Sequence, residues 1–98
     1  MQWSAKSDQL NANVVSWDAG GGVGAHVNDA LDVVIAVLAG SGYLDIDGTV
    51  LTLEPGLVTL IQRGTRRAIT AGSAGLRYVT CHQARLGAMH VTGVRTIP

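Results

Sequence analysis

The chain has 98 residues, of which 47% are hydrophobic and 14% are charged, and seven acidic residues balance seven basic ones. This length suits one domain, and zero net charge excludes the overall field that would attract nucleic acid or an anionic membrane. Because only one cysteine is present, no disulfide forms within the chain, and we expect a cytoplasmic, reducing location.

The chain shows no targeting or membrane-spanning pattern. Residues 1–10 are polar and contain no apolar stretch, so we expect a loose N-terminal segment without an export signal. The longest apolar run, residues 33–39, is too short to cross a bilayer. We therefore expect no membrane partner.

Short apolar runs alternate with glycine-bearing turns from Asn13 onward, a rhythm that predicts an all-β sandwich or barrel. The expected strands are residues 13–18, 24–27, 32–38, 42–46, 50–53, 57–61, 66–70, 76–83 and 90–95. Asp47-Gly48 predicts a hairpin turn between two of them. Glu54-Pro55-Gly56 predicts a second turn, and residues 72–75 predict a third.

The strand predicted at residues 32–38 is apolar on both faces. One face carries Val33, Ile35 and Val37, and the other carries Val34, Ala36 and Leu38. One face can fill a barrel, whereas the other needs a second sheet or a partner subunit to cover it. We therefore expect a homodimer.

Five residues have the spacing of a known metal-binding motif: Gly20, His26, Asn28, Asp32 and Gly40. Their order resembles the first motif of the cupin superfamily. In this chain Asn28 stands where that motif has a second histidine, and Asp32 stands where it has a glutamate. The resemblance implies a double-stranded β-helix, or jelly-roll, barrel of the RmlC-like type over residues 1–98. It also favours dimerisation, which is common among cupins.

The second cupin motif maps onto residues 56–71. Gly56 and Gly64 keep its glycines, whereas Arg67 stands in place of the third histidine ligand and Ala71 in place of the asparagine. A guanidinium has no lone pair to give to a metal, and its charge repels a cation. The resemblance therefore indicates the fold more strongly than the activity.

A metal site is nevertheless one hypothesis. His26 and Asn28 share one side of a predicted strand, and Asp32 can reach the same cavity. His82 has the same strand parity as Tyr78, so it supplies a further imidazole if that side faces inward. The resemblance then implies a metal-dependent dioxygenase or isomerase that holds Fe, Mn, Ni or Zn through His26, Asp32 and His82.

The leading hypothesis is a small-molecule site without a metal. If Arg67 points inward beside His26, Asn28 and Asp32, the cavity suits a small polar or anionic ligand. If Arg67 instead forms an ion pair with Asp32, the barrel is an inert structural or regulatory domain. The sequence leaves open whether Arg67 faces the cavity, and it indicates no reaction. The few aromatic residues are scattered, which argues against a nucleic-acid surface.

Overall fold

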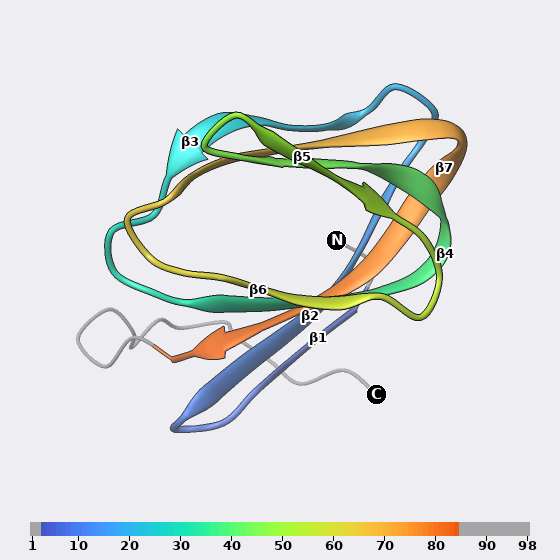
Figure 1. The fold of residues 1–98 in the computed structure, drawn as a ribbon. Coiled ribbons are helices and arrows are strands. Elements are labelled where there is room, and N and C mark those ends of the chain that lie inside the picture. Colours follow the sequence, from blue (N-terminus) through green and yellow to red (C-terminus); the bar gives the residue numbers. More distant parts are fainter. Residues whose placement is uncertain (1–2, 85–98) are drawn as a thin grey trace.

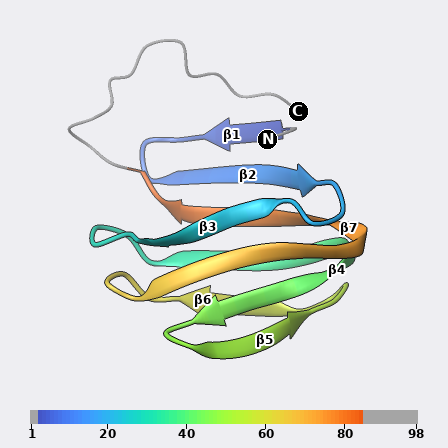
Figure 2. The same cartoon turned by 90° about the horizontal axis from the view of Figure 1, so that it is seen from above.

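The computed structural model describes residues 3–84, whose regular structure consists of antiparallel strands. The strands are β1 (Trp3–Lys6), β2 (Leu10–Trp17), β3 (Gly22–Val27), β4 (Val33–Ile46), β5 (Thr49–Leu53), β6 (Val58–Ile61) and β7 (Arg66–Gln83). They are ordered β1-β2-β7-β4-β5, with β3 beside β7 and β6 beside β4. Figure 1 shows that they curl around an interior, and Figure 2 shows the strands side by side from β1 to β5. The predicted all-β barrel is confirmed.

The two longest strands, β4 and β7, contribute to both walls of the barrel. Residues 33–37 of β4 pair with residues 78–82 of β7, and residues 42–46 pair with residues 67–71. The register shifts between these stretches, where both strands bend. The sequence predicted four separate strands here and a turn at residues 72–75. That prediction is wrong, because β4 and β7 each continue as one strand across the register shift, although residues 72–75 of β7 have no partner in β4.

Glycines make the bend possible. Gly40 and Gly75 lie at its centre with φ of 81° and 77°, a region that side chains with a Cβ rarely adopt. A Cβ added to Gly40 would also collide with the backbone oxygen of Gly75. The bend therefore needs glycine for both conformation and space.

Two of the predicted turns are confirmed. Asp47 and Gly48 connect β4 to β5 with φ of 49° and 89°, the two positive values of a type I′ hairpin turn. In the next turn, the backbone nitrogen of Leu57 donates to the oxygen of Glu54 over 3.1 Å, and Gly56 has a φ of 92°.

The N-terminal segment differs from the loose stretch that we expected over residues 1–10. Strand β1 pairs with β2 from Trp3 opposite Val14 to Lys6 opposite Asn11. In the intervening turn, Ser7 Oγ accepts hydrogen bonds from the backbone nitrogens of Gln9 and Leu10. The expectation is wrong for residues 3–10, because the backbone of this edge strand is satisfied by its pairing with β2. The strand expected at residues 90–95 lies outside the described residues.

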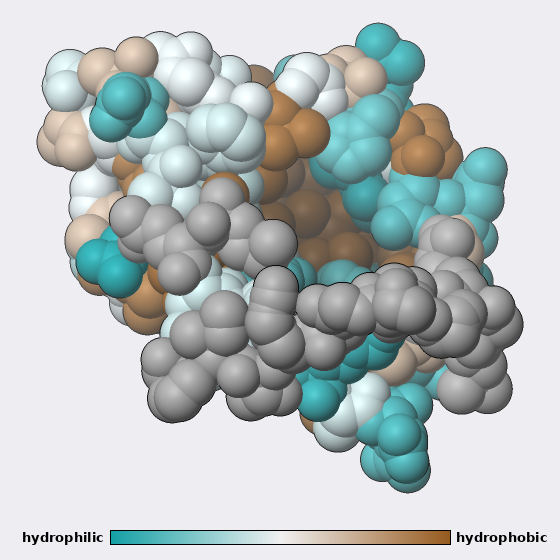
Figure 3. Space-filling view, turned by 180° about the vertical axis from the view of Figure 1, so that it is seen from behind, coloured by the Kyte–Doolittle hydropathy of each residue, from teal (hydrophilic) through white to brown (hydrophobic). Residues whose placement is uncertain are grey.

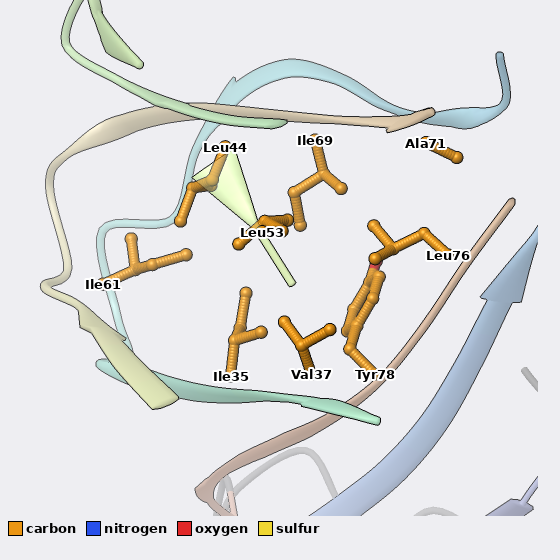
Figure 4. Packing of buried hydrophobic residues seen from close by; sticks show 9 residues of the cluster. All are labelled: Ile35, Val37, Leu44, Leu53, Ile61, Ile69, Ala71, Leu76 and Tyr78. Atoms are coloured by element: carbon orange, nitrogen blue, oxygen red, sulfur yellow. The ribbon is translucent and has the colours of Figure 1, made fainter. Parts of the chain in front are cut away.

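The core fills the space between the two walls. Its buried side chains are Ile35, Val37, Leu44, Leu53, Ile61, Ile69, Ala71, Leu76 and Tyr78. Figure 4 shows that they come from opposite walls and point toward one another. Alternate residues of β4, such as Val34 and Leu38, point outward and are exposed. Within the described residues, no helix is long and apolar enough to cross a membrane.

Candidate functional site

A cavity of about 410 Å³ lies between the walls of the barrel. Its apolar lining comes from Val15, Val23, Val33, Ile35, Ile61 and Ile69, together with the ring of Trp17. Its polar lining comes from His26, Asn28, Arg67, Tyr78, Thr80 and His82. The face drawn in Figure 3 is hollowed, and hydrophobic residues lie inside the hollow. The volume lies in the range of pockets that hold small molecules.

Arg67 and the two histidines lie at one end of the barrel. Strand pairing places His26 opposite Arg67, near the start of β7, and places His82, near the end of β7, opposite Val33. Because β7 doubles back at its bend, its two ends lie at the same end of the barrel. The cavity therefore has a polar end, while Trp17 and Tyr78 lie nearer the bend.

Arg67 is the charged side chain that the barrel buries, with 5% of its surface exposed. Its Nη2 donates to the backbone oxygen of Gln62 over 3.2 Å, whereas its buried Nε has no hydrogen-bond partner. No acidic side chain is among the described residues that line the cavity. A buried cation without a counter-charge is costly, so this end of the cavity favours an anion.

His26 and Asn28 also line the cavity, but each is partly committed to its own loop. His26 Nδ1 lies 2.9 Å from the backbone oxygen of Gly24, an arrangement that leaves Nε2 available. Asn28 Oδ1 accepts hydrogen bonds from the backbone nitrogens of Ala30 and Leu31, at 2.9 and 3.1 Å. The amide oxygen therefore holds the turn, and Nδ2 remains available to a bound molecule.

Asp32 is absent from the residues that line the cavity. Its Oδ1 accepts a hydrogen bond of 2.8 Å from the backbone nitrogen of Arg63, and the residue is exposed. Because neighbouring residues of an extended chain point to opposite sides and Val33 lines the cavity, Asp32 projects outward. The structure therefore corrects the expected place of Asp32 in the site, and Asp32 bonds the backbone of Arg63 instead of forming the ion pair with Arg67 that the sequence left open.

Comparisons with known proteins agree with this architecture. No protein-family model and no curated protein sequence matches the chain. KdgF from a Halomonas species is 21% identical with a TM-score of 0.77, and the match covers 83% of this chain and 74% of that one. A cupin protein from Bacteroides fragilis is 24% identical with a TM-score of 0.68 over 91% and 80% of the two chains. An RmlC-like cupin from Shewanella frigidimarina is 18% identical with a TM-score of 0.74 over 82% and 71%.

This chain has the cupin fold. The double-stranded β-helix that the motif spacing implied is thus confirmed. Identities this low establish the fold and not the activity, because one fold supports many unrelated functions.

The metal chemistry that is implied by the cupin motifs does not fit the residues of this cavity. His26 and His82 both line it, but Asp32 does not join them. Among residues 3–84, no group of three His, Cys, Asp or Glu side chains could hold a metal ion. Two imidazoles beside a guanidinium give too few ligands and an adverse charge for Fe, Mn, Ni or Zn.

Tyr78 and Thr80, for which the sequence suggested no functional role, also line the cupin cavity. Trp17 Nε1 donates to Tyr78 Oη over 3.0 Å, and Asn13 Nδ2 donates to Thr80 Oγ1 over 3.3 Å. Burial raises the pKa of the Tyr78 phenol, although the hydrogen bond with Trp17 lowers it in part. Their strand parity with His82 was the only signal in the sequence that linked them to the cavity.

Proposed function

We propose that this cupin barrel binds a small anionic molecule whose acidic group contacts Arg67. The observation that carries the proposal is the buried guanidinium, whose Nε has no hydrogen-bond partner in a cavity without an acidic lining residue. A carboxylate accepts paired hydrogen bonds from a guanidinium and neutralises its charge. Such a ligand would offset the energetic cost of burying this positive charge.

The remaining lining restricts the ligand further. His26 pairs with Arg67 across β3 and β7, so its Nε2 is well placed to bind the same acidic group. The side chains of Ile35 and Ile69 make the middle of the cavity apolar. A small carboxylic acid with an apolar body therefore fits better than a free inorganic anion. The proposal assigns no reaction to the barrel.

The test compares Arg67→Met with Arg77→Met. Arg77 lies on the same strand but is exposed, so its variant controls for the loss of one positive charge. Benzoate, pentanoate and inorganic phosphate serve as probes in thermal unfolding and calorimetry. At a probe concentration 100 times its dissociation constant, binding stabilises the native state by about 2.7 kcal/mol. We expect this stabilisation in the wild type and in Arg77→Met, and its loss in Arg67→Met.

Other outcomes would favour other functions. Equal binding by Arg67→Met and the wild type would contradict the proposal. No binding of any probe would favour an inert structural or regulatory cupin domain. Stoichiometric metal in protein purified without chelators would favour the metal-dependent enzyme, and His26→Ala would then abolish metal uptake.

We also propose that the chain forms a homodimer through the outer face of one wall. A row of paired apolar residues crosses five strands of this face: Ala5, Ala12, Cys81, Val34 and Leu60. A second row consists of Trp3, Val14, Val79, Ala36 and Val58. Val58 and Leu60 are 66% and 52% exposed, and an apolar area of this kind favours contact with a protein surface.

A second copy of the chain presents the same uncharged rows, so the two faces can cover each other. The proposal places this dimer in the cytoplasm, where a protein with a single cysteine needs no disulfide.

A further inference from the structure

Two hydroxyl groups in the cavity are held in the same way. Tyr78 and Thr80 are two positions apart on β7 and line the same cavity. Each accepts a hydrogen bond from β2, Tyr78 from Trp17 Nε1 and Thr80 from Asn13 Nδ2. An indole N–H and an amide NH₂ only donate, so the hydroxyl oxygen is the acceptor in both pairs. The O–H hydrogen of each residue is therefore left to donate elsewhere.

The hydroxyl of Tyr78 depends more strongly on an acceptor inside the protein, because this residue is only 2% exposed. No acceptor for its O–H hydrogen is found among the described residues. Burial also raises the pKa of this phenol, which keeps its proton in place at neutral pH. A buried donor without an acceptor is costly. The acceptor that Tyr78 lacks must therefore come from the contents of the cavity.

Building on the proposed anion site, we infer that the ligand is an oxo or hydroxy carboxylic acid. Its carboxylate contacts Arg67, and its uncharged oxygen accepts hydrogen bonds from Tyr78 and Thr80. The two ends of this ligand would meet different walls of the barrel. Arg67 lies before the bend of β7, in one wall, whereas Tyr78 and Thr80 lie after the bend, in the other wall. The ligand thus spans the cavity from wall to wall.

This arrangement distinguishes an oxo acid from the matching acid that has the carboxylate but lacks the uncharged oxygen. The acid without this carbonyl or hydroxyl oxygen, here called the oxygen-free acid, would place carbon beside Tyr78 and Thr80. It would leave their two hydroxyl donors without acceptors. A site whose polar groups are left unpaired rejects such an analogue strongly. We expect the oxo acid to bind about ten-fold to hundred-fold more tightly.

The test uses matched pairs of probes. We would measure 4-oxopentanoate against 4-methylpentanoate and 4-acetylbenzoate against 4-isopropylbenzoate by calorimetry. The pairs differ in the distance between carboxylate and carbonyl, and within each pair the size is similar. Acetophenone, which has the carbonyl but no carboxylate, reports the contribution of the hydroxyl donors alone.

The variants Tyr78→Phe and Thr80→Val remove each hydroxyl with little change in volume. We expect the double variant to bind both members of each pair equally, because the hydroxyl donors that distinguish them are gone, although Trp17 Nε1 and Asn13 Nδ2 also lose their acceptors. Tyr43→Phe is the control, because Tyr43 is an exposed tyrosine on β4. Circular dichroism and thermal unfolding would verify that each variant is folded.

The outcomes separate this inference from the proposed function. Equal affinities within both pairs in the wild type would overturn the inference and leave the anion site standing. A preference for the oxo acids that survives in the double variant would overturn it as well. If Arg67→Met binds every acid as the wild type does, or if the wild type binds none, the proposed function itself is wrong and the inference fails with it.

Discussion

Arg67 is a buried cation that no described residue of the cavity neutralises, which is the opposite of what stability alone favours. Replacing it with methionine removes the charge and keeps most of the volume. We predict that Arg67→Met leaves the free energy of unfolding of the ligand-free protein unchanged or raises it by about 1–4 kcal/mol. Urea unfolding of the wild type and the variant would measure the difference.

A large loss of stability in this variant would contradict the prediction. It would mean that the hydrogen bond from Arg67 to Gln62 holds the loop before β7, and that the residue has a structural role. Gain of stability together with loss of ligand binding is the pattern expected of a functional residue.

Tyr78 gives the barrel a defined response to alkaline pH. Because burial raises its pKa, the folded state holds the phenol proton more tightly than the unfolded chain does. The resulting stabilisation is fully present below about pH 10 and is lost as the pH rises through the folded pKa. We predict that Tyr78→Phe weakens the fall of unfolding free energy above this pH.

The titration can be followed directly in a Tyr43→Phe background, where Tyr78 is the remaining tyrosine. The absorbance of the phenolate at 295 nm then reports one group. Ionisation at the same pH in folded and urea-unfolded protein would show that burial does not shift this pKa.

Residue placement also shows how far the sequence could predict the site. The motif spacing drew attention to His26, Asn28 and Arg67, which all line the cavity, but it left open whether Arg67 faces inward. Asp32 was misplaced because a shift of one residue reverses the direction of a side chain. The donor role of Tyr78 depends on Trp17, a residue on another strand that no local pattern connects to it.

Among the strands and their connections, the turns were easier to predict than the bends. Asp47-Gly48 marks a tight hairpin by its own chemistry, and the structure has the hairpin there. Residues 72–75 also contain two glycines, yet β7 continues through them. Local sequence indicates that glycine is needed, but it does not show that β7 pairs with β4 on both sides of residues 72–75 and so continues past them.

The bend yields a prediction with an internal control. Gly40 and Gly48 have similar φ values of 81° and 89°, but only Gly40 has backbone atoms where a Cβ would lie. We predict that Gly48→Ala costs about 1–2 kcal/mol for the conformation alone. Gly40→Ala should cost about 3 kcal/mol or more, because the backbones of β4 and β7 must also separate.

Urea unfolding of the two alanine variants would test this difference. Equal losses of stability would mean that the bend can open without cost, and that close backbone contact does not fix the angle between the walls.

The outer apolar rows determine the expected assembly. We predict a particle of twice the 10.2 kDa chain mass in sedimentation equilibrium. Val34→Lys together with Leu60→Lys should convert it to a monomer, because two charges would enter the centre of the contact. Val50→Lys, on β5 of the opposite wall, should leave the dimer intact, although Val50 is 59% exposed. A wild-type monomer, or a dimer that tolerates both lysines, would contradict the proposal.

The position of β7 in the sheet also affects how the chain can fold. Strands β2, β3 and β4 all pair with β7, which is the last described strand in the sequence. During synthesis, the hairpin of β4 and β5 can form early from neighbouring residues, whereas neither wall can close until residues 66–83 have left the ribosome. Until then several strand edges stay open to other chains, so slow emergence of this one segment is the step at which aggregation competes with folding.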